Sequence, residues 1–243
     1  LDEFGPGPGE FLASVDLIVH TGDVTGPLVL DWMEQFGPLL VNRGNHDTFD
    51  DPRLEVVSSA DLRSAAHARN VGTHAAARHA DLVAFCDADD LVADGWLRAL
   101  VDALGDHAAV GGRLIDVYPD ERMRAWRPPA TPDGLPSFLG VPYIVTANMV
   151  IRADAFEAVG GFDTALVRCE DIAISWALLR AGHTIGFAPD AVVEYRHRPG
   201  LWPLLRQHEL YGRGMSQVLA RYGLPTGDGW TPPSGMKMLR PNG

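Results

Sequence analysis

The stretch DLVAFCDADD, from Asp81 to Asp90, decides the fold. Its first half is apolar on both faces, which is typical of a strand buried in an α/β sheet. It ends in three carboxylates, Asp87, Asp89 and Asp90, with no basic residue between them. Such sheets bind ligands beyond the carboxyl ends of their strands, where carboxylate oxygens suit the hard cations that carry phosphates. The same acids also fit a solvated turn before a helix.

Composition excludes several classes of protein. The chain has 243 residues, 46% hydrophobic and 21% charged, so it can bury a substantial core as a globular protein. A net charge of −12 argues against a general nucleic-acid binder, which needs a basic surface. Residues 191–222 are locally basic, with five arginines against two glutamates. This segment suits a diphosphate, an anionic membrane surface or an ordinary helix surface.

Cysteine usage and hydropathy predict a location. The two cysteines, Cys86 and Cys169, imply no disulfide framework and favour a reducing compartment. No apolar stretch approaches the roughly 20 residues that span a bilayer, and the start shows no signal-peptide pattern. We therefore expect a cytoplasmic protein. Trp202 and Leu205 point to packing or to peripheral contact with a membrane.

Strands and helices alternate along the chain, which predicts βαβ units and a mixed, mostly parallel sheet flanked by helices. Residues 15–222 are expected to form one domain between a Gly/Pro-rich arm, 1–14, and a Gly/Pro-rich tail, 223–243. The proline-rich stretch 118–142 should be a loop-rich insertion. The expected strands are 15–20, 38–42, 54–57 and the apolar run before Asp87, and the expected helices are 27–36, 60–80 and 95–104.

Further segments accompany the acidic stretch in a fixed order. They are SAAHARNVGTHAA (64–76), ANMVIRADAFEAVGGFD (147–163), CEDIAISWALLRAGHTIGFAPDAVVEYRHR (169–198) and LLRQHELYGRG (204–214). With DLVAFCDADD they resemble family 2 glycosyltransferases of the GT-A fold, over residues 52–222. The resemblance implies an α/β, nucleotide-diphospho-sugar transferase-like domain. It also implies an inverting hexosyltransferase that uses Mn or Mg, a nucleotide-diphosphate sugar and a hydroxyl on a glycan, lipid or small molecule. A non-catalytic nucleotide-sugar-binding domain is the alternative.

The resemblance assigns metal-site residues by position. Asp87 and Asp89 correspond to the DxD pair, in which Asp89 binds the metal directly and Asp87 contacts the ribose or a metal-bound water. Asp90 is expected to cap the next helix. His197, in EYRHR, stands where the family often adds a further metal ligand. A structural or surface role for this histidine is the alternative.

The catalytic base is expected at the start of a helix. The family's base is the aspartate of a Glu-Asp pair, which corresponds to Asp171, with Glu170 beside the donor. Two acids in a first turn also fit a purely structural role, because they complement the helix dipole. Arg69 and Asn70 should lie near the nucleotide, and Gly161 should let the backbone approach the sugar.

Residues 15–50 instead resemble calcineurin-like metallophosphoesterases, through DLIVHTGDV and GNHD. By position, that family's bridging aspartate, metal-binding asparagine and catalytic histidine correspond to Asp23, Asn45 and His46. The family's Asp-x-His and GHxH sequences do not occur in the chain. Asp23 and Asn45 alone cannot hold two metals, because each metal needs several ligands. A phosphoesterase remnant is therefore an alternative function, and 15–51 is an atypical opening for a GT-A domain.

Overall fold

The computed structural model describes residues 18–20, 39–41, 59, 62, 64–78, 80–87, 90–124, 133–197 and 200–224. For 18–20 and 39–41 it describes the backbone alone. The expected helix 27–36, the expected strand 54–57, the arm 1–14 and tail residues 225–243 lie outside this set. So do Asp23, Asn45, His46 and Asp89.

A five-stranded mixed sheet runs in the order β3–β8–β5–β9–β4. These strands are β3 (Leu82–Cys86), β4 (Leu91–Val92), β5 (Ala109–Val117), β8 (Asn148–Arg152) and β9 (Ile185–Arg196). In it, β5 and β9 pair in parallel, and the other three pairs are antiparallel. A second, parallel pair joins β1 (Ile18–His20) to β2 (Leu39–Val41), and a hairpin joins β6 (Ser137–Phe138) to β7 (Val141–Pro142).

The mixed sheet confirms the expected α/β class, and strands lie where 15–20 and 38–42 predicted them. The expectation of mostly parallel pairing is wrong for the described five-stranded sheet. Two of the three antiparallel pairs involve β8, which follows the β6–β7 hairpin rather than a crossover helix and so can run against its neighbours. The third joins the two-residue β4 to β9. Because β8 separates β3 from β5, the strands β3, β5 and β9 still share one direction.

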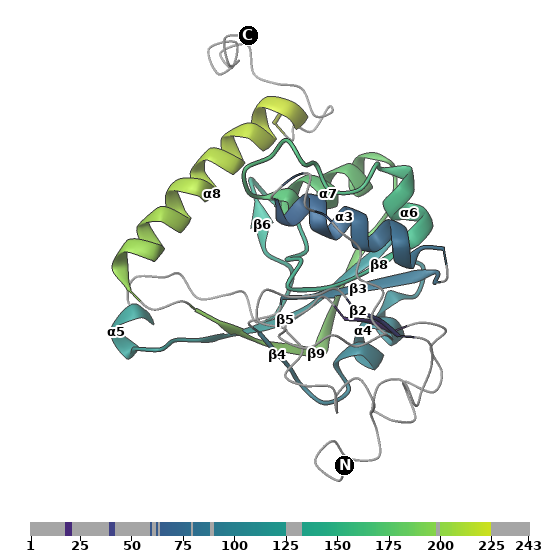
Figure 1. Cartoon of the computed structure of the whole chain (residues 1–243), viewed down its shortest axis with the longest axis horizontal. Helices are drawn as coiled ribbons and strands as arrows, with labels where there is room; N and C mark the ends of the chain where they lie inside the picture. Colours follow the sequence, from purple (N-terminus) through teal and green to yellow (C-terminus); the bar gives the residue numbers. More distant parts are fainter. Residues whose placement is uncertain are drawn as a thin grey trace.

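Helices cover both faces of the sheet (Figure 1). Helices α3 (Ala65–Ala76), α6 (Ala153–Ala158) and α7 (Glu170–Arg180) lie on one face, and α4 (Trp96–Leu104) lies on the other. Alternation along the strands separates the two cores: Val83 and Phe85 pack toward α3, α6 and α7, whereas Val150 packs toward α4. The apolar run in β3 is therefore buried on both sides, as the sequence predicted.

Local sequence sets the ends of the helices. Ser64 begins α3 by accepting a hydrogen bond from the backbone N–H of His67 at 3.0 Å. Gly72 lies inside this helix, which continues through it to Ala76. Helix α4 matches the predicted 95–104 and ends at Gly105, while α7 ends before Gly182, which has a φ of +87°.

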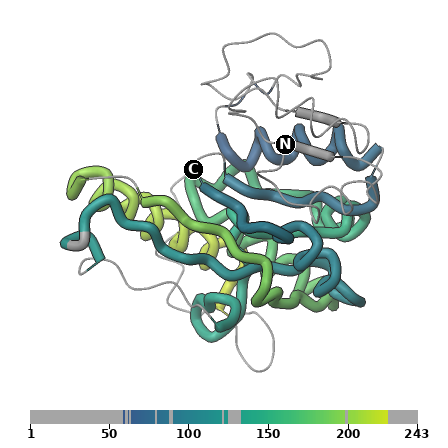
Figure 2. The backbone as a smooth tube through the Cα atoms, turned by 90° about the horizontal axis from the view of Figure 1, so that it is seen from below, coloured from purple at the N-terminus to yellow at the C-terminus, as the bar shows by residue number. Residues whose placement is uncertain are grey.

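The insertion 118–142 contains a short helix, α5 (Glu121–Arg124), and the β6–β7 hairpin. Figure 2 shows β5 and β9 running side by side past the rest of the sheet toward the start of α8 (Leu201–Tyr222). Helix α8 packs Val218 against Trp176 of α7. None of the described helices combines the length and the hydropathy needed to cross a bilayer.

Candidate active site

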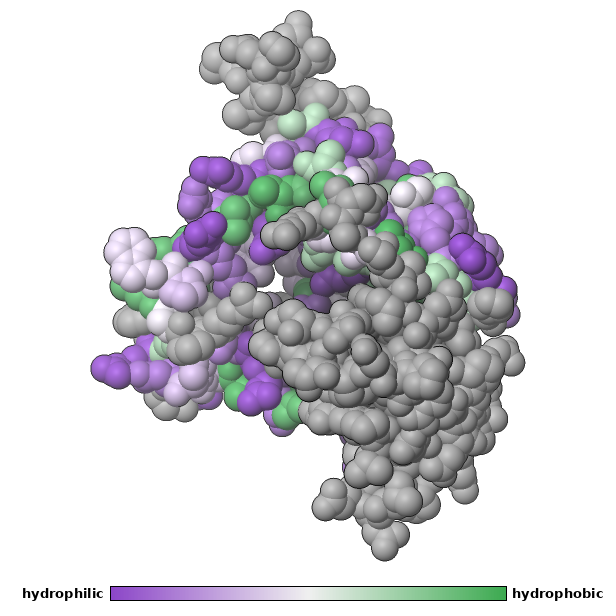
Figure 3. All heavy atoms as spheres, in the orientation of Figure 1, coloured by the Kyte–Doolittle hydropathy of each residue, from purple (hydrophilic) through white to green (hydrophobic). Residues whose placement is uncertain are grey.

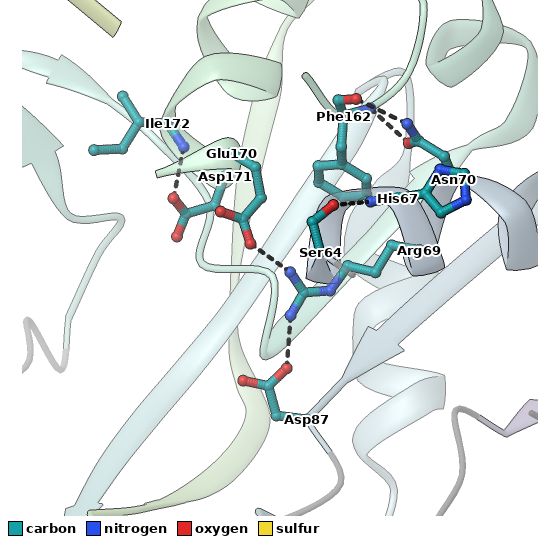
Figure 4. A network of polar contacts seen from close by, with 9 residues as sticks. All are labelled: Ser64, His67, Arg69, Asn70, Asp87, Phe162, Glu170, Asp171 and Ile172. Carbon is teal, nitrogen blue, oxygen red and sulfur yellow. Dashed lines mark hydrogen bonds and ion pairs between the residues drawn. The ribbon is translucent and has the colours of Figure 1, made fainter. Parts of the chain in front are cut away.

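Arg69 joins two of the predicted acids (Figure 4). From α3, its Nη2 lies 2.9 Å from Oδ1 of Asp87, and its Nη1 lies 2.7 Å from Oε1 of Glu170. Asp87 follows the last residue of β3, and Glu170 is the first residue of α7. Their side chains are 34% and 13% exposed, respectively. The structure thus brings a strand end and a helix start together around one guanidinium, at a surface that solvent reaches.

Asn70 and Gly161 also meet, through the loop that follows α6. The Asn70 side chain accepts from the N–H of Phe162 and donates to its carbonyl oxygen, both at 2.8 Å. Gly161 has a φ of +71°, and a Cβ there would lie 2.9 Å from Oδ1 of Asn70. Arg69 packs 6.0 Å above the Phe162 ring. Asn70 therefore fixes this loop beside Arg69, and its predicted contact with a nucleotide stays a prediction.

Asp171 lies next to Glu170 in a different environment. One carboxylate oxygen accepts a hydrogen bond from the N–H of Ile172 at 2.8 Å, and Figure 4 shows the group turned away from Arg69. Burial, reinforced by the negative charge of Glu170, raises the pKa of Asp171 to about 7, against the opposing effects of the Ile172 N–H and Arg69. A carboxyl group with this pKa exchanges protons near neutral pH, as a general base must.

Aromatic and thiol groups from three segments surround Asp171. Burial, with the nearby charge of Asp171, raises the pKa of Tyr143 far above its usual range. Burial raises the pKa of Cys169 to about 12, so both groups stay neutral beside the carboxylate. The OH of Tyr211, on α8, accepts a hydrogen bond from Gln207 at 2.9 Å. Gln207 and Tyr211, four residues apart, therefore lie on one face of α8.

Tyr143 and Tyr195 were missed by sequence reasoning. Tyr195, on β9, hydrogen-bonds with Tyr211, and burial raises its pKa, with further contributions from Asp87 and Asp90. Tyrosines that follow a hairpin or end a strand carry no local signal of their partners. Only the topology brings Tyr143 near Asp171 and Tyr195 near Asp87.

Two of the three predicted metal ligands lie in the described part of the chain. Asp87 forms an ion pair with Arg69. His197 Nε2 lies 2.7 Å from Oδ1 of Asp116, and its ring stacks on Tyr118 with centroids 4.7 Å apart. Its side chain is 7% exposed. Within the described residues, no three His, Cys, Asp or Glu side chains gather as a metal site would require.

Asp90 does not cap the next helix. Its Oδ1 accepts a hydrogen bond from the N–H of Arg196 at 2.9 Å, whereas the N-cap of α4 is Gly95. The correction follows from β4, which intervenes between Asp90 and α4 and pairs with β9. Asp90 therefore ties the acidic turn to the end of β9.

Helix α8 exposes apolar side chains in its first two turns. Trp202 is 81% exposed, and Leu201 and Leu205 are about half exposed, at 48% and 49%. Trp202 and Leu205 belong to none of the core clusters of the described residues, and packing of these side chains stays a prediction. Contact with a membrane stays a prediction.

Two family models match the chain. Residues 43–160 match the model described as Glycosyl transferase family 2, and residues 133–235 match Glycosyl transferase family group 2. The GNHD segment therefore lies inside a glycosyltransferase match. The pre-mycofactocin glycosyltransferase of Mycobacterium tuberculosis is 30% identical over 184 residues, which are 70% of this chain and 38% of that protein. The glycosyltransferase AglE of Haloferax volcanii is 26% identical over 195 residues, 79% of this chain and 62% of that protein.

Solved structures share the fold at low sequence identity. A mannosyltransferase from Pyrobaculum calidifontis, in complex with GDP-Man and Mn²⁺, superposes with a TM-score of 0.55 at 17% identity, covering 93% of this chain and 69% of that one. TarS from S. aureus, in complex with UDP-GlcNAc, superposes with a TM-score of 0.54 at 15% identity, covering 87% of this chain and 67% of that one.

The mixed sheet flanked by helices, with acids at its carboxyl edge, is a GT-A fold. The chain belongs to glycosyltransferase family 2. It spans less than two thirds of the length of the curated relatives named above.

Proposed function

We propose that the chain transfers a sugar, with inversion, from a nucleotide-diphosphate donor to a hydroxyl group, with Asp171 as the general base. The observation that carries this proposal is the half-buried Asp171, whose carboxyl pKa burial raises to about 7. Asp171 lies in the same site as Asp87. Arg69 joins the two, because it contacts both Asp87 and Glu170, the residue that precedes Asp171. A base and a donor-binding acid on opposite sides of one sugar are what inverting transfer needs.

Asp87, Arg69 and Asp171 would have different roles in the reaction. Asp87 would hold the donor at the carboxyl edge of β3, where ligands of open α/β sheets bind. Arg69 would keep Asp87 and Glu170 in place before the donor arrives and would offer positive charge to the diphosphate afterwards. Asp171 would take the proton from the acceptor hydroxyl as its oxygen attacks the anomeric carbon.

A divalent metal, Mn or Mg, fits the acids of this site in part. Asp87 fits because its carboxylate is a hard oxygen donor that solvent reaches. His197 fits less well, because its Nε2 is engaged by Asp116, and it could bind a metal through that atom only by exchanging this partner. We keep Asp87, Asp89 and His197 as the proposed ligands. When bound, the metal would stabilise the negative charge on the leaving diphosphate.

The bound ligands of the structural neighbours support the donor class. One was solved with GDP-Man and Mn²⁺ and another with UDP-GlcNAc. The acceptor would enter from the side of α8, where Figure 3 shows a hollow between this helix and the sheet. Tyr211, on α8, and Tyr143 lie near Asp171 and would offer aromatic surfaces to a bound sugar. We propose a hydroxyl-bearing glycan, lipid or small molecule as the acceptor.

The test is a panel of UDP, GDP, TDP and their sugars, each with Mn²⁺, read by thermal shift and by release of nucleoside diphosphate. A ligand that binds only the folded state raises its stability, so the matching donor should raise the Tm. Binding without turnover would favour the non-catalytic alternative. Hydrolysis of an aryl phosphate that disappears in His46→Ala would favour the phosphoesterase alternative.

A further inference from the structure

The second half of α8 lies against the loop that leads into the proposed base. This loop, residues 163–169, joins the Gly161–Phe162 turn to α7. Nε of Arg221 lies 2.7 Å from Oδ2 of Asp163, whose side chain is only 10% exposed. Nearer the base, the N–H of Val167 donates to Oε1 of Gln217 at 2.9 Å. Two side chains of one helix thus hold the start and the middle of the loop.

Backbone contact holds the end of the loop. A Cβ on Gly214 would lie 2.5 Å from the carbonyl oxygen of Arg168 and 2.8 Å from its carbon. One turn earlier in α8, the carbonyl oxygen of Tyr211 accepts a hydrogen bond from the thiol of Cys169, with Sγ and O 3.7 Å apart. Spacings of three and four residues place Tyr211, Gly214, Gln217 and Arg221 on one helical face, which we call the clamp face. Only a glycine lets α8 approach this closely.

The clamped loop ends in a left-handed residue. Cys169 has a φ of +68°, which a residue with a side chain rarely adopts, and it is the N-cap of α7. Such a conformation persists only where surrounding contacts hold it. Glu170 and Asp171 follow directly, so the contacts that hold Cys169 also set the position of both carboxylates.

We propose that the clamp face of α8, through Gly214 and Gln217, positions Asp171 for proton transfer. This inference rests on the proposed role of Asp171 and adds residues that touch neither donor nor acceptor. Gly214 and Gln217 are thus positioning residues. Displacing a reacting group by about 1 Å can cost about 100-fold in rate, so a small shift of the loop suffices.

Other groups also face Asp171, and the experiment has to leave them in place. They are Glu170 on its own helix, Arg69 from α3, Tyr143 after the hairpin, and Cys169 and Tyr211 at the clamp. Substitutions at Gly214 and Gln217 change none of these side chains. Any change in proton transfer then reports the position of Asp171 rather than the loss of a neighbour.

Two glycines of α8 form a matched pair for the test. A Cβ on Gly214 meets the Arg168 carbonyl, whereas a Cβ on Gly212 meets nothing within 4 Å. We expect Gly214→Ala to lower kcat by about 10-fold or more while the donor KM stays within about twofold, because Asp87 and Arg69 lie on other elements. Gly212→Ala should leave both constants unchanged.

A second pair covers the case in which Gly214→Ala does not fold. Gln217→Met removes the acceptor for the Val167 N–H, and Gln217→Glu keeps an oxygen in the same place. We expect Gln217→Met to lower kcat without raising the donor KM, and Gln217→Glu to restore kcat. If folded Gln217→Met and Gly214→Ala both keep the wild-type kcat, the clamp proposal is wrong.

Asp171→Asn, measured alongside, separates the two proposals. If this variant loses transfer while the clamp variants keep it, the base assignment stands and the clamp fails. If Asp171→Asn transfers sugar normally, the base assignment itself fails. Equal losses of kcat and of donor affinity in the clamp variants, with a lower Tm, would mark the contacts as purely structural and overturn the clamp proposal.

Discussion

Glu170 and Asp171 are adjacent carboxylates at the start of α7 that occupy opposite environments. Glu170 is ion-paired to Arg69 at 2.7 Å, whereas Asp171 is turned toward the N–H of Ile172. The charge on Glu170 adds to the effect of burial on the pKa of Asp171. The pair therefore gives one carboxylate that is held by a guanidinium and one that titrates near neutral pH.

The rate of transfer should rise with pH through about 7. Only the ionised form of Asp171 can accept a proton, and burial raises its pKa to about 7. With saturating donor and metal, kcat should increase about tenfold per pH unit below this value and level off above it. A kcat that is flat or falling between pH 6 and 8 would contradict the assignment.

Asp171→Asn should make the protein more stable at pH 8. The folded-state pKa of Asp171 is raised above its value of about 3.9 in an unfolded chain, so folding favours the protonated form. The wild type therefore loses stability as pH rises from about 4 through 7, on the order of 1 kcal/mol per unit of pKa shift. Thermal unfolding should show the Tm advantage of the variant shrinking from pH 8 to pH 5. An advantage that grows toward acid would mean that the folded-state pKa is lowered instead.

Arg69→Met should destabilise the protein by about 1–2 kcal/mol, because it leaves two partly buried carboxylates facing each other without a cation. Arg69→Lys should restore little, since a single ammonium group lacks the fork that spans Asp87 and Glu170. Arg122→Met, which breaks an exposed pair with Asp120, is the control and should leave the Tm unchanged. Unfolding in denaturant provides the comparison, and equal stability of Arg69→Met and wild type would show that the bridge contributes nothing.

Nucleoside diphosphate should stabilise the protein more with Mn²⁺ than with EDTA. Asp87→Asn and Asp89→Asn should each remove that difference, because an amide is a much weaker ligand for a hard cation. Asp102→Asn, on the exposed side of α4, is the matched control and should keep it. A thermal shift that is the same with EDTA as with Mn²⁺ in the wild type would contradict metal-assisted binding.

The sequence predicted those parts of the fold that are encoded locally. The apolar run before Asp87 reads as a buried strand because its neighbours on both faces are helices. Helix α4 could be bounded because an apolar stripe is followed by Gly105, which ends it. The direction of β8 could not be predicted, because antiparallel pairing there depends on the preceding hairpin and not on the strand's own residues.

The site likewise has features that the sequence could predict and features that it could not. Arg69, Glu170 and Asp87 stand in motifs, so their proximity could be anticipated, but the bridge that Arg69 makes could not. His197 and Asp116 are 81 residues apart, and nothing in either segment indicates that they pair. The close approach of Gly214 to Arg168 could not be predicted either, because a glycine in a helix does not indicate which segment packs against it.

The central claim is that Asp171 is the base of a nucleotide-sugar transferase, and turnover of a matched donor by Asp171→Asn tests it most directly. An asparagine can still accept a hydrogen bond from Ile172, but it cannot accept a proton from a hydroxyl. With a donor identified by thermal shift, we expect the variant to bind donor and Mn²⁺ like the wild type while transfer falls by about 100-fold or more. Transfer by a folded Asp171→Asn at the wild-type rate would contradict the account.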